Sequence, residues 1–160
     1  MKNFIWDTLY FKIRKKEITK SRYRLRRIKI DTILNILIRN CKEKNIKYNI
    51  IDKTHNVILI ELIGKRKKIL LKYHIADIIF IDEYNSFLSK VKKVNPHKAI
   101  YITTGVFEAK IHKLQHRIVF PKKVTLEDYS YFMKTQLGII EKTIYIFKQK
   151  KINFYKYLPI

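Results

Sequence analysis

Apolar and polar residues follow two different periods along the first half of the chain. In segment 31–44, DTILNILIRNCKEK, apolar residues recur every three or four positions, which predicts an amphipathic helix. Three apolar runs follow, and we expect strands over 46–52, 56–62 and 68–74. The glycine at position 64 marks a turn between the last two strands, which should therefore form a hairpin.

The second half of the chain alternates between helical and strand patterns. The helical period returns over 82–94 and ends at Asn95-Pro96, and a short, almost wholly apolar strand follows at 98–104. We expect two more helices, at 106–115 and 125–137, with one short strand between them at 117–120.

This order of elements is typical of an α/β fold. Thr125 and Asp128 fit the start of the last helix as a cap followed by an acid. Helix, three strands, helix, strand, helix, strand and helix predict a mixed central sheet flanked by helices. We expect three regions: a basic N-terminal arm at 1–29, a core at 30–138, and a basic, aromatic C-terminal extension at 139–160.

The charge balance narrows the class of partner. The chain has 36 Lys and Arg against 13 Asp and Glu, for a formal net charge of +23, and such a charge makes a polyanion the expected partner. No apolar run approaches the roughly 18 residues of a membrane-spanning helix, and the N-terminal sequence lacks the pattern of a secretory signal. We therefore expect neither a membrane span nor secretion. A single cysteine, Cys41, excludes an internal disulfide and a Cys-based zinc site.

Two stretches resemble the Mrr-like branch of the restriction-endonuclease-like fold. They are NVILIELIGKRKKILLKYH at 56–74 and NPHKAIYITTGVFEAKIHKLQHRIVF at 95–120. VTLEDYSYFM at 124–133 is similar to the closing helix of that family. The resemblance covers about residues 31–135 and implies an α/β core of the nuclease type.

The resemblance also implies where an active site would lie. The family carries an Asp at the start of one strand and Glu/Gln-x-Lys on the next, so that acidic oxygens hold Mg²⁺ against the phosphate and the Lys assists water. These positions fall on Asn56, Leu70 and Lys72. Asp52 or Glu61 could replace the missing acids only under a shifted register. Without two carboxylates a divalent cation has little to hold it, so we expect no metal, no cofactor and no catalytic residue.

Four smaller features leave alternatives open. His112 and His116 have metal-ligand spacing but no third ligand, which favours ordinary surface histidines. GKRKK at Gly64 lacks the upstream glycine of a phosphate loop and is better interpreted as a basic hairpin tip. Thr-Thr-Gly at 103–105 either caps a helix or offers its amides to an anion. Lys72 is either a solvated side chain at a strand end or a phosphate contact.

Aromatic and basic residues are mixed in YFKIRKK, SRYRLRR and NFYKYLPI. Such mixtures stack on unpaired bases and neutralise phosphates, although a basic tail beside core aromatics gives the same pattern. The residues that we expect to contact nucleic acid are Lys12, Arg14, Lys15, Lys16, Arg22, Arg24, Arg26, Arg27, Lys65, Arg66, Lys67, Lys68, Lys72, Lys148, Lys150 and Lys151.

Composition suggests a source as well as a partner. Abundant Ile, Lys, Asn and Tyr indicate an A+T-rich coding sequence. We expect a non-enzymatic, RNA-binding structural component of a large ribonucleoprotein, such as a ribosomal protein of a mitochondrion or other organelle (otherwise cytoplasmic), with rRNA and neighbouring proteins as partners. The alternative is an Mrr-like, Mg²⁺-dependent DNA endonuclease or DNA-binding protein of a virus, plasmid or A+T-rich bacterium. A third, weaker hypothesis is a protein-docking subunit whose charge serves solubility.

Overall fold

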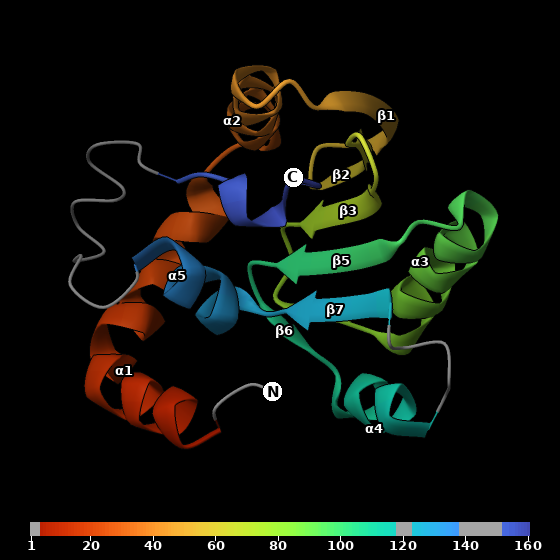
Figure 1. Cartoon of the computed structure of the whole chain (residues 1–160). Helices are drawn as coiled ribbons and strands as arrows, with labels where there is room; N and C mark the ends of the chain where they lie inside the picture. Colours follow the sequence, from red (N-terminus) through yellow and green to blue (C-terminus); the bar gives the residue numbers. More distant parts are fainter. Residues whose placement is uncertain (1–3, 118–122, 138–151) are drawn as a thin grey trace.

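A five-stranded mixed sheet forms the centre of the computed structural model, which describes residues 4–117, 123–137 and 152–160 (Figure 1). The strands, in their order across the sheet, are β1 (Lys47–Lys53), β2 (Val57–Ile63), β3 (Lys68–His74), β5 (Lys98–Thr103) and β7 (Val124–Glu127). The first three pair antiparallel, whereas β5 is parallel to β3 and β7 is parallel to β5. The expected α/β class with a mixed central sheet is confirmed.

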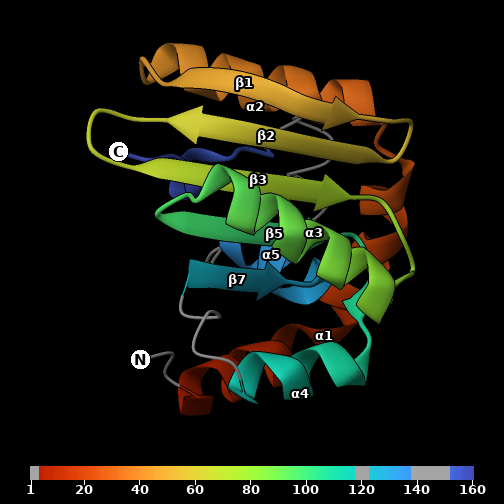
Figure 2. The ribbon, with the colours of Figure 1, turned by 90° about the vertical axis from the view of Figure 1, so that its right-hand side faces the viewer.

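Helices cover both faces of this sheet (Figures 1 and 2). One face carries α1 (Phe4–Arg27), α2 (Ile30–Glu43), α5 (Tyr129–Leu137) and the short 3-10 helix η2 (Tyr155–Tyr157). The other face carries α3 (Ile81–Val94) and α4 (Ala109–Arg117). Within the described part of the chain, no helix combines the length and apolar character needed to cross a membrane.

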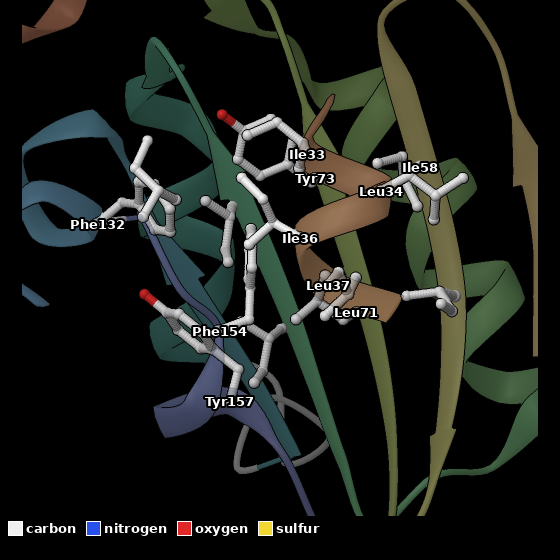
Figure 3. Close-up of a cluster of buried hydrophobic side chains, with 14 of the residues drawn as sticks. Ile33, Leu34, Ile36, Leu37, Ile58, Leu71, Tyr73, Phe132, Phe154 and Tyr157 are labelled. Atoms are coloured by element: carbon white, nitrogen blue, oxygen red, sulfur yellow. The ribbon is translucent and has the colours of Figure 1, made fainter. Parts of the chain in front are cut away.

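The central strand β3 contributes to two hydrophobic cores. Its Leu71 and Tyr73 pack with Ile33 of α2 and with Phe154 in one cluster (Figure 3). Leu70 belongs to the second cluster, under α3. Because side chains alternate along a strand, β3 is covered on both faces, which explains its almost continuous apolar sequence.

The C-terminal segment returns to the core. The Phe154 amide donates to the buried Asn40 Oδ1 at 2.7 Å, and the Gln136 amide group exchanges two hydrogen bonds, of 2.9 and 3.0 Å, with the Asn153 backbone. Phe154 and Tyr157 are buried. The hypothesis that these two aromatic rings stack on bases is therefore wrong, since both fill the core.

The N-terminal segment is a helix rather than an open arm. The α1 sequence contains no Gly or Pro, so nothing in it interrupts the helical backbone. Ile18 and Leu25, seven residues apart, are both buried. The Phe11 ring lies edge-on to Tyr131 of α5, with 5.1 Å between ring centroids. Helix α1 therefore packs against the domain through a narrow row of apolar side chains. The many charged residues of the helix make this row hard to recognise in the sequence.

The segment around Thr125 also differs from the prediction. Val124–Glu127 is strand β7, paired in parallel with β5, and the helix begins only at Tyr129. The Asp128 carboxylate caps that helix by accepting from the Ser130 and Tyr131 amides at 3.0 and 3.1 Å. Thr125 is therefore no cap. Four residues are too few for hydrophobic periodicity to separate a strand from a helix.

A second, two-stranded parallel sheet was not predicted. It joins β4 (Ile78–Ile79) to β6 (Val106–Phe107), so α4 starts at Ala109 and not at 106. Of the short strand predicted at 117–120, Arg117 belongs to α4 and the remaining residues lie outside the described ones.

The Thr-Thr-Gly turn does not cap a helix that follows it, because β6 comes next, and its amides are not free for an anion. The amides of Thr104, Gly105 and Val106 donate to the His74 carbonyl, the Thr103 hydroxyl and the Asp77 carbonyl. A Cβ placed on Gly105 would lie 2.1 Å from the Asp77 carbonyl oxygen. The glycine is thus required by the close approach of two backbone segments.

Replacement of Leu25 tests whether α1 is packed. Leu25 is 0% exposed, and Leu25→Ala should lower the free energy of unfolding by about 2–5 kcal/mol because it leaves a cavity. Tyr23, on the same helix, is 66% exposed, so Tyr23→Ala should cost less than about 0.5 kcal/mol. Urea unfolding followed by circular dichroism measures both. Equal effects of the two substitutions would show that α1 is not part of the folded unit.

Candidate nucleic-acid interface

The β2–β3 turn and the end of α1 lie toward opposite ends of β3 (Figure 2), and both carry cations. At its start, the β2–β3 turn presents the exposed residues 65–67. Beyond its end, the Arg22 guanidinium donates to the Asp77 carbonyl at 3.0 Å and Arg26 forms an ion pair with the Asp77 carboxylate, which places the end of α1 there. Six residue steps of about 3.3 Å separate the two ends of the strand by about 20 Å. Among the described residues, the predicted cations of α1 and those of the β2–β3 turn therefore belong to two different surfaces.

The α1 cations differ in their exposure. Arg14 pairs with Glu17 at 2.8 Å and is largely covered, and the Arg22 guanidinium lies 5.1 Å from the Tyr129 ring centroid. Both side chains are held by the protein itself and are poor candidates for phosphate contacts. The exposed cations predicted on this helix are Lys12, Lys15, Lys16, Arg24, Arg26 and Arg27.

Lys68 and the three predicted C-terminal lysines differ from the exposed hairpin tip. The Lys68 ammonium lies 3.0 Å from the Glu61 carboxylate, which reduces the charge it offers to a phosphate. Lys148, Lys150 and Lys151 lie outside the described residues. The tip at 65–67 is therefore the exposed basic part of the hairpin.

Lys72 is not a solvated strand-end lysine. Its side chain faces α3, and its Nζ lies 4.7 Å from the centroid of the Tyr101 ring on β5. Burial lowers the pKa of Lys72, while the negative charges of Glu83 and Asp52 oppose that shift. The lysine thus stands in a partly desolvated site beside an aromatic ring, and the charges of Glu83 and Asp52 act on it.

His74 completes this cluster, although no sequence motif identified it as a site residue. The side chain is 5% exposed, with Nδ1 2.9 Å from the Tyr101 hydroxyl and Nε2 3.8 Å from the Glu83 carboxylate. Burial, followed by the charge of Lys72, lowers the pKa of His74 to about 4 against the opposing effect of Glu83. Burial also raises the pKa of Tyr101. At neutral pH the histidine and the phenol are therefore both uncharged, and neither adds a charge beside Lys72.

The family's acid positions do not converge on Lys72. Leu70 is fully buried under α3. The Asn56 side-chain oxygen accepts from the Thr54 hydroxyl at 2.9 Å, inside the β1–β2 turn. Neither side chain supplies an anionic ligand, so the positions that the resemblance implies do not fit a divalent cation.

The two substitute acids also lie apart. Asp52 pairs with Leu59, which pairs with Lys72, so Asp52 stands two strands from the lysine in the same cross-strand row. Glu61 stands opposite Leu70, two pairs further along the strand, and is bound to Lys68. Over the described ranges 4–117, 123–137 and 152–160, no three His, Cys, Asp or Glu residues gather in a way that could hold a metal ion.

Comparisons with known proteins do not identify a relative whose function could be compared with this site. No family model matches the sequence, and no curated protein matches it. One solved structure is similar, the crystal structure of the protein of unknown function AF1548, with 10% sequence identity and a TM-score of 0.43. The similarity covers 76% of this chain and 67% of that one. A likeness at this level carries no argument about function.

The depressed pKa of His74 predicts a loss of stability in mild acid. Its pKa of about 4 in the fold lies below the ordinary 6.5, so between these values the unfolded chain binds a proton that the folded chain does not. Stability from this group is complete above about pH 6.5 and decreases as the pH falls toward 4, by about 3 kcal/mol at most.

The measurement is urea unfolding at pH 7 and pH 4.5 for three proteins. His74→Gln should remove most of the pH dependence seen in the wild type, whereas His55→Gln, at an exposed position, should keep it. The same pH dependence in all three proteins would exclude His74 as its source.

Proposed function

We propose that this chain is a non-enzymatic, RNA-binding component of a large ribonucleoprotein. The observation that carries the proposal is the arrangement of the +23 net charge, with exposed cations along α1 and at the β2–β3 turn. A polyanion is the partner that such a charge favours, because each neutralised phosphate releases a counterion.

The separation of the two basic surfaces favours an extended partner. A small anion would occupy only one of them, whereas an RNA strand or helix spans about 20 Å with several phosphates. The exposed lysines of α1 contact one part of this RNA and the tip at 65–67 contacts another. The folded α/β core holds the two surfaces at a fixed spacing.

The nuclease-like resemblance fits binding without cleavage. In the proposed core, Leu70 and Asn56 occupy the positions where that family carries metal-binding residues, and a leucine or an amide cannot replace a carboxylate. We propose that the core serves as a scaffold in an organellar particle, such as a mitochondrial ribosome with its rRNA. The support for that compartment is the A+T-rich coding bias.

An apolar surface supports neighbouring proteins as further partners. The first turns of α1 expose five large apolar side chains, between 46% and 82% exposed: Phe4, Ile5, Trp6, Leu9 and Ile13. Contiguous exposed apolar residues on a soluble domain usually mark a contact with another macromolecule. A protein inside a large assembly would bury this surface against its neighbours.

Sedimentation of the tagged protein from its own cells tests the proposal. The wild type should sediment with a ribosome-sized particle that contains RNA, and rising salt should release it steeply. The variant with Lys12→Gln, Lys15→Gln and Lys16→Gln removes three exposed charges of α1 and should be released at a clearly lower salt concentration.

A matched variant controls for net charge alone. Lys90→Gln, Lys93→Gln and Lys113→Gln remove three exposed charges from α3 and α4, on the other face of the sheet, and should leave the release concentration near that of the wild type. Sedimentation of the wild type as a small, RNA-free protein would contradict the proposal.

The second candidate is an Mg²⁺-dependent DNA endonuclease or a DNA-binding relative. The partly desolvated Lys72, on which the charges of Glu83 and Asp52 act, is the observation that favours it. The fit of a metal is poor, as the missing acids show, so we expect DNA to bind without being cut.

A plasmid cleavage assay with Mg²⁺ or with a chelator distinguishes the two candidates. We expect no cleavage under either condition, together with a salt-dependent shift of the DNA on a native gel. Mg²⁺-dependent cleavage that is lost in Lys72→Ala and kept in Lys90→Ala would establish the enzyme instead. Lys90 is the control because it is an exposed lysine of α3.

A further inference from the structure

A pocket of about 640 Å³ opens at the hairpin end of the sheet. Its walls are the α2–β1 turn at 44–46, the β2–β3 turn at 65–67, and Pro159 with Ile160. Figure 2 shows the C-terminal segment ending beside the β2–β3 turn. Residues more than 90 positions apart in the sequence therefore form one concave surface.

The rim of this pocket is cationic. Lys44, Lys65, Arg66 and Lys67 all line it and are all exposed. Among the described residues, no Asp or Glu side chain belongs to the lining, and the neighbouring Glu43 accepts a hydrogen bond from the Tyr155 hydroxyl. Four cations without an acidic side chain in the lining make this pocket well suited to an anion.

The inner surface is apolar and held in place by backbone contacts. Ile46, Pro159 and Ile160 supply the apolar lining. The backbone of Pro159 lies so close to Gly64 that a Cβ there would stand 2.1 Å from the Pro159 carbonyl oxygen. Asn45 turns the chain with a left-handed φ of 55° and donates its amide to the Lys42 carbonyl at 3.2 Å. A preformed wall costs little entropy when a ligand binds.

We propose that this pocket holds a single nucleotide of the bound RNA. Its phosphate lies among the cations of the rim, where the Arg66 guanidinium can offer two parallel N–H donors to phosphate oxygens. The base packs against the Ile46 and Pro159 side chains. The volume lies within the range of about 300–1,000 Å³ typical of small-ligand pockets.

This inference rests on the proposed RNA binding for its partner, and it goes further by naming the unit that is recognised. A basic hairpin tip alone would contact phosphates and ignore the base. The apolar wall beside the cations predicts instead that phosphate and base are bound together.

Free ligands and the full-length protein test the pocket apart from any RNA. Adenosine 5′-monophosphate should shift the amide signals of residues 44–46 and 65–67 in an NMR titration. Adenosine alone and inorganic phosphate alone should each bind at least tenfold more weakly. Arg66→Gln, at an exposed position, should weaken binding of the monophosphate about tenfold, whereas Lys90→Gln on α3 should leave it unchanged.

The outcomes separate this inference from the proposed function. Equal affinity for phosphate and for adenosine monophosphate would overturn the nucleotide pocket and leave an unselective cationic tip. Shifts elsewhere on the protein, or no shifts at all, would overturn it as well. Nucleotide binding at this pocket, together with RNA-free sedimentation, would keep the pocket and exclude the ribonucleoprotein.

Discussion

The hydrogen bonding of β3 on both edges, together with its burial on both faces, is the constraint on which the rest of the molecule depends. Antiparallel pairing with β2 fixes the hairpin, and parallel pairing with β5 requires the crossover through α3. Every β3 side chain must face one of two packed helical layers. The cationic tip then lies where this strand begins, and the end of α1 lies just beyond its last residue.

Sequence patterns predicted the elements that form from local sequence alone, without support from distant parts of the chain. The strand at 68–74 agrees with β3 residue for residue, because an apolar run after a glycine turn has few other solutions. Helix α1 was missed as a packed element because its charges outnumber its apolar residues. Phe11, Ile18 and Leu25 do recur every seven residues, but only the folded structure shows that this row packs against α5.

The candidate site could be predicted only in part, for a related reason. Lys72 was identified from its place in a hairpin, but its surroundings come from α3 and β5, which no local pattern connects to it. The His74 and Tyr101 side chains meet across 27 residues of sequence. In the same way, the hydrogen bond from Arg22 to the Asp77 carbonyl depends on tertiary packing, so the number of cations in the sequence overstates how many are open to a phosphate.

The bond between the Phe154 amide and the Asn40 side chain has a consequence for how the chain folds during its synthesis. It joins residues 114 positions apart, and closing a loop of that length costs roughly 4 kcal/mol of entropy before any contact compensates for it. Helix α2 and the β1–β2–β3 meander can form on the ribosome as soon as they emerge. The core beneath α2 closes only after residues 152–158 have been translated. Until then Asn40 has no Phe154 amide to accept from. The isoleucine side chains of this core stay exposed in the nascent chain, which therefore depends on the ribosome surface or on chaperones to prevent aggregation.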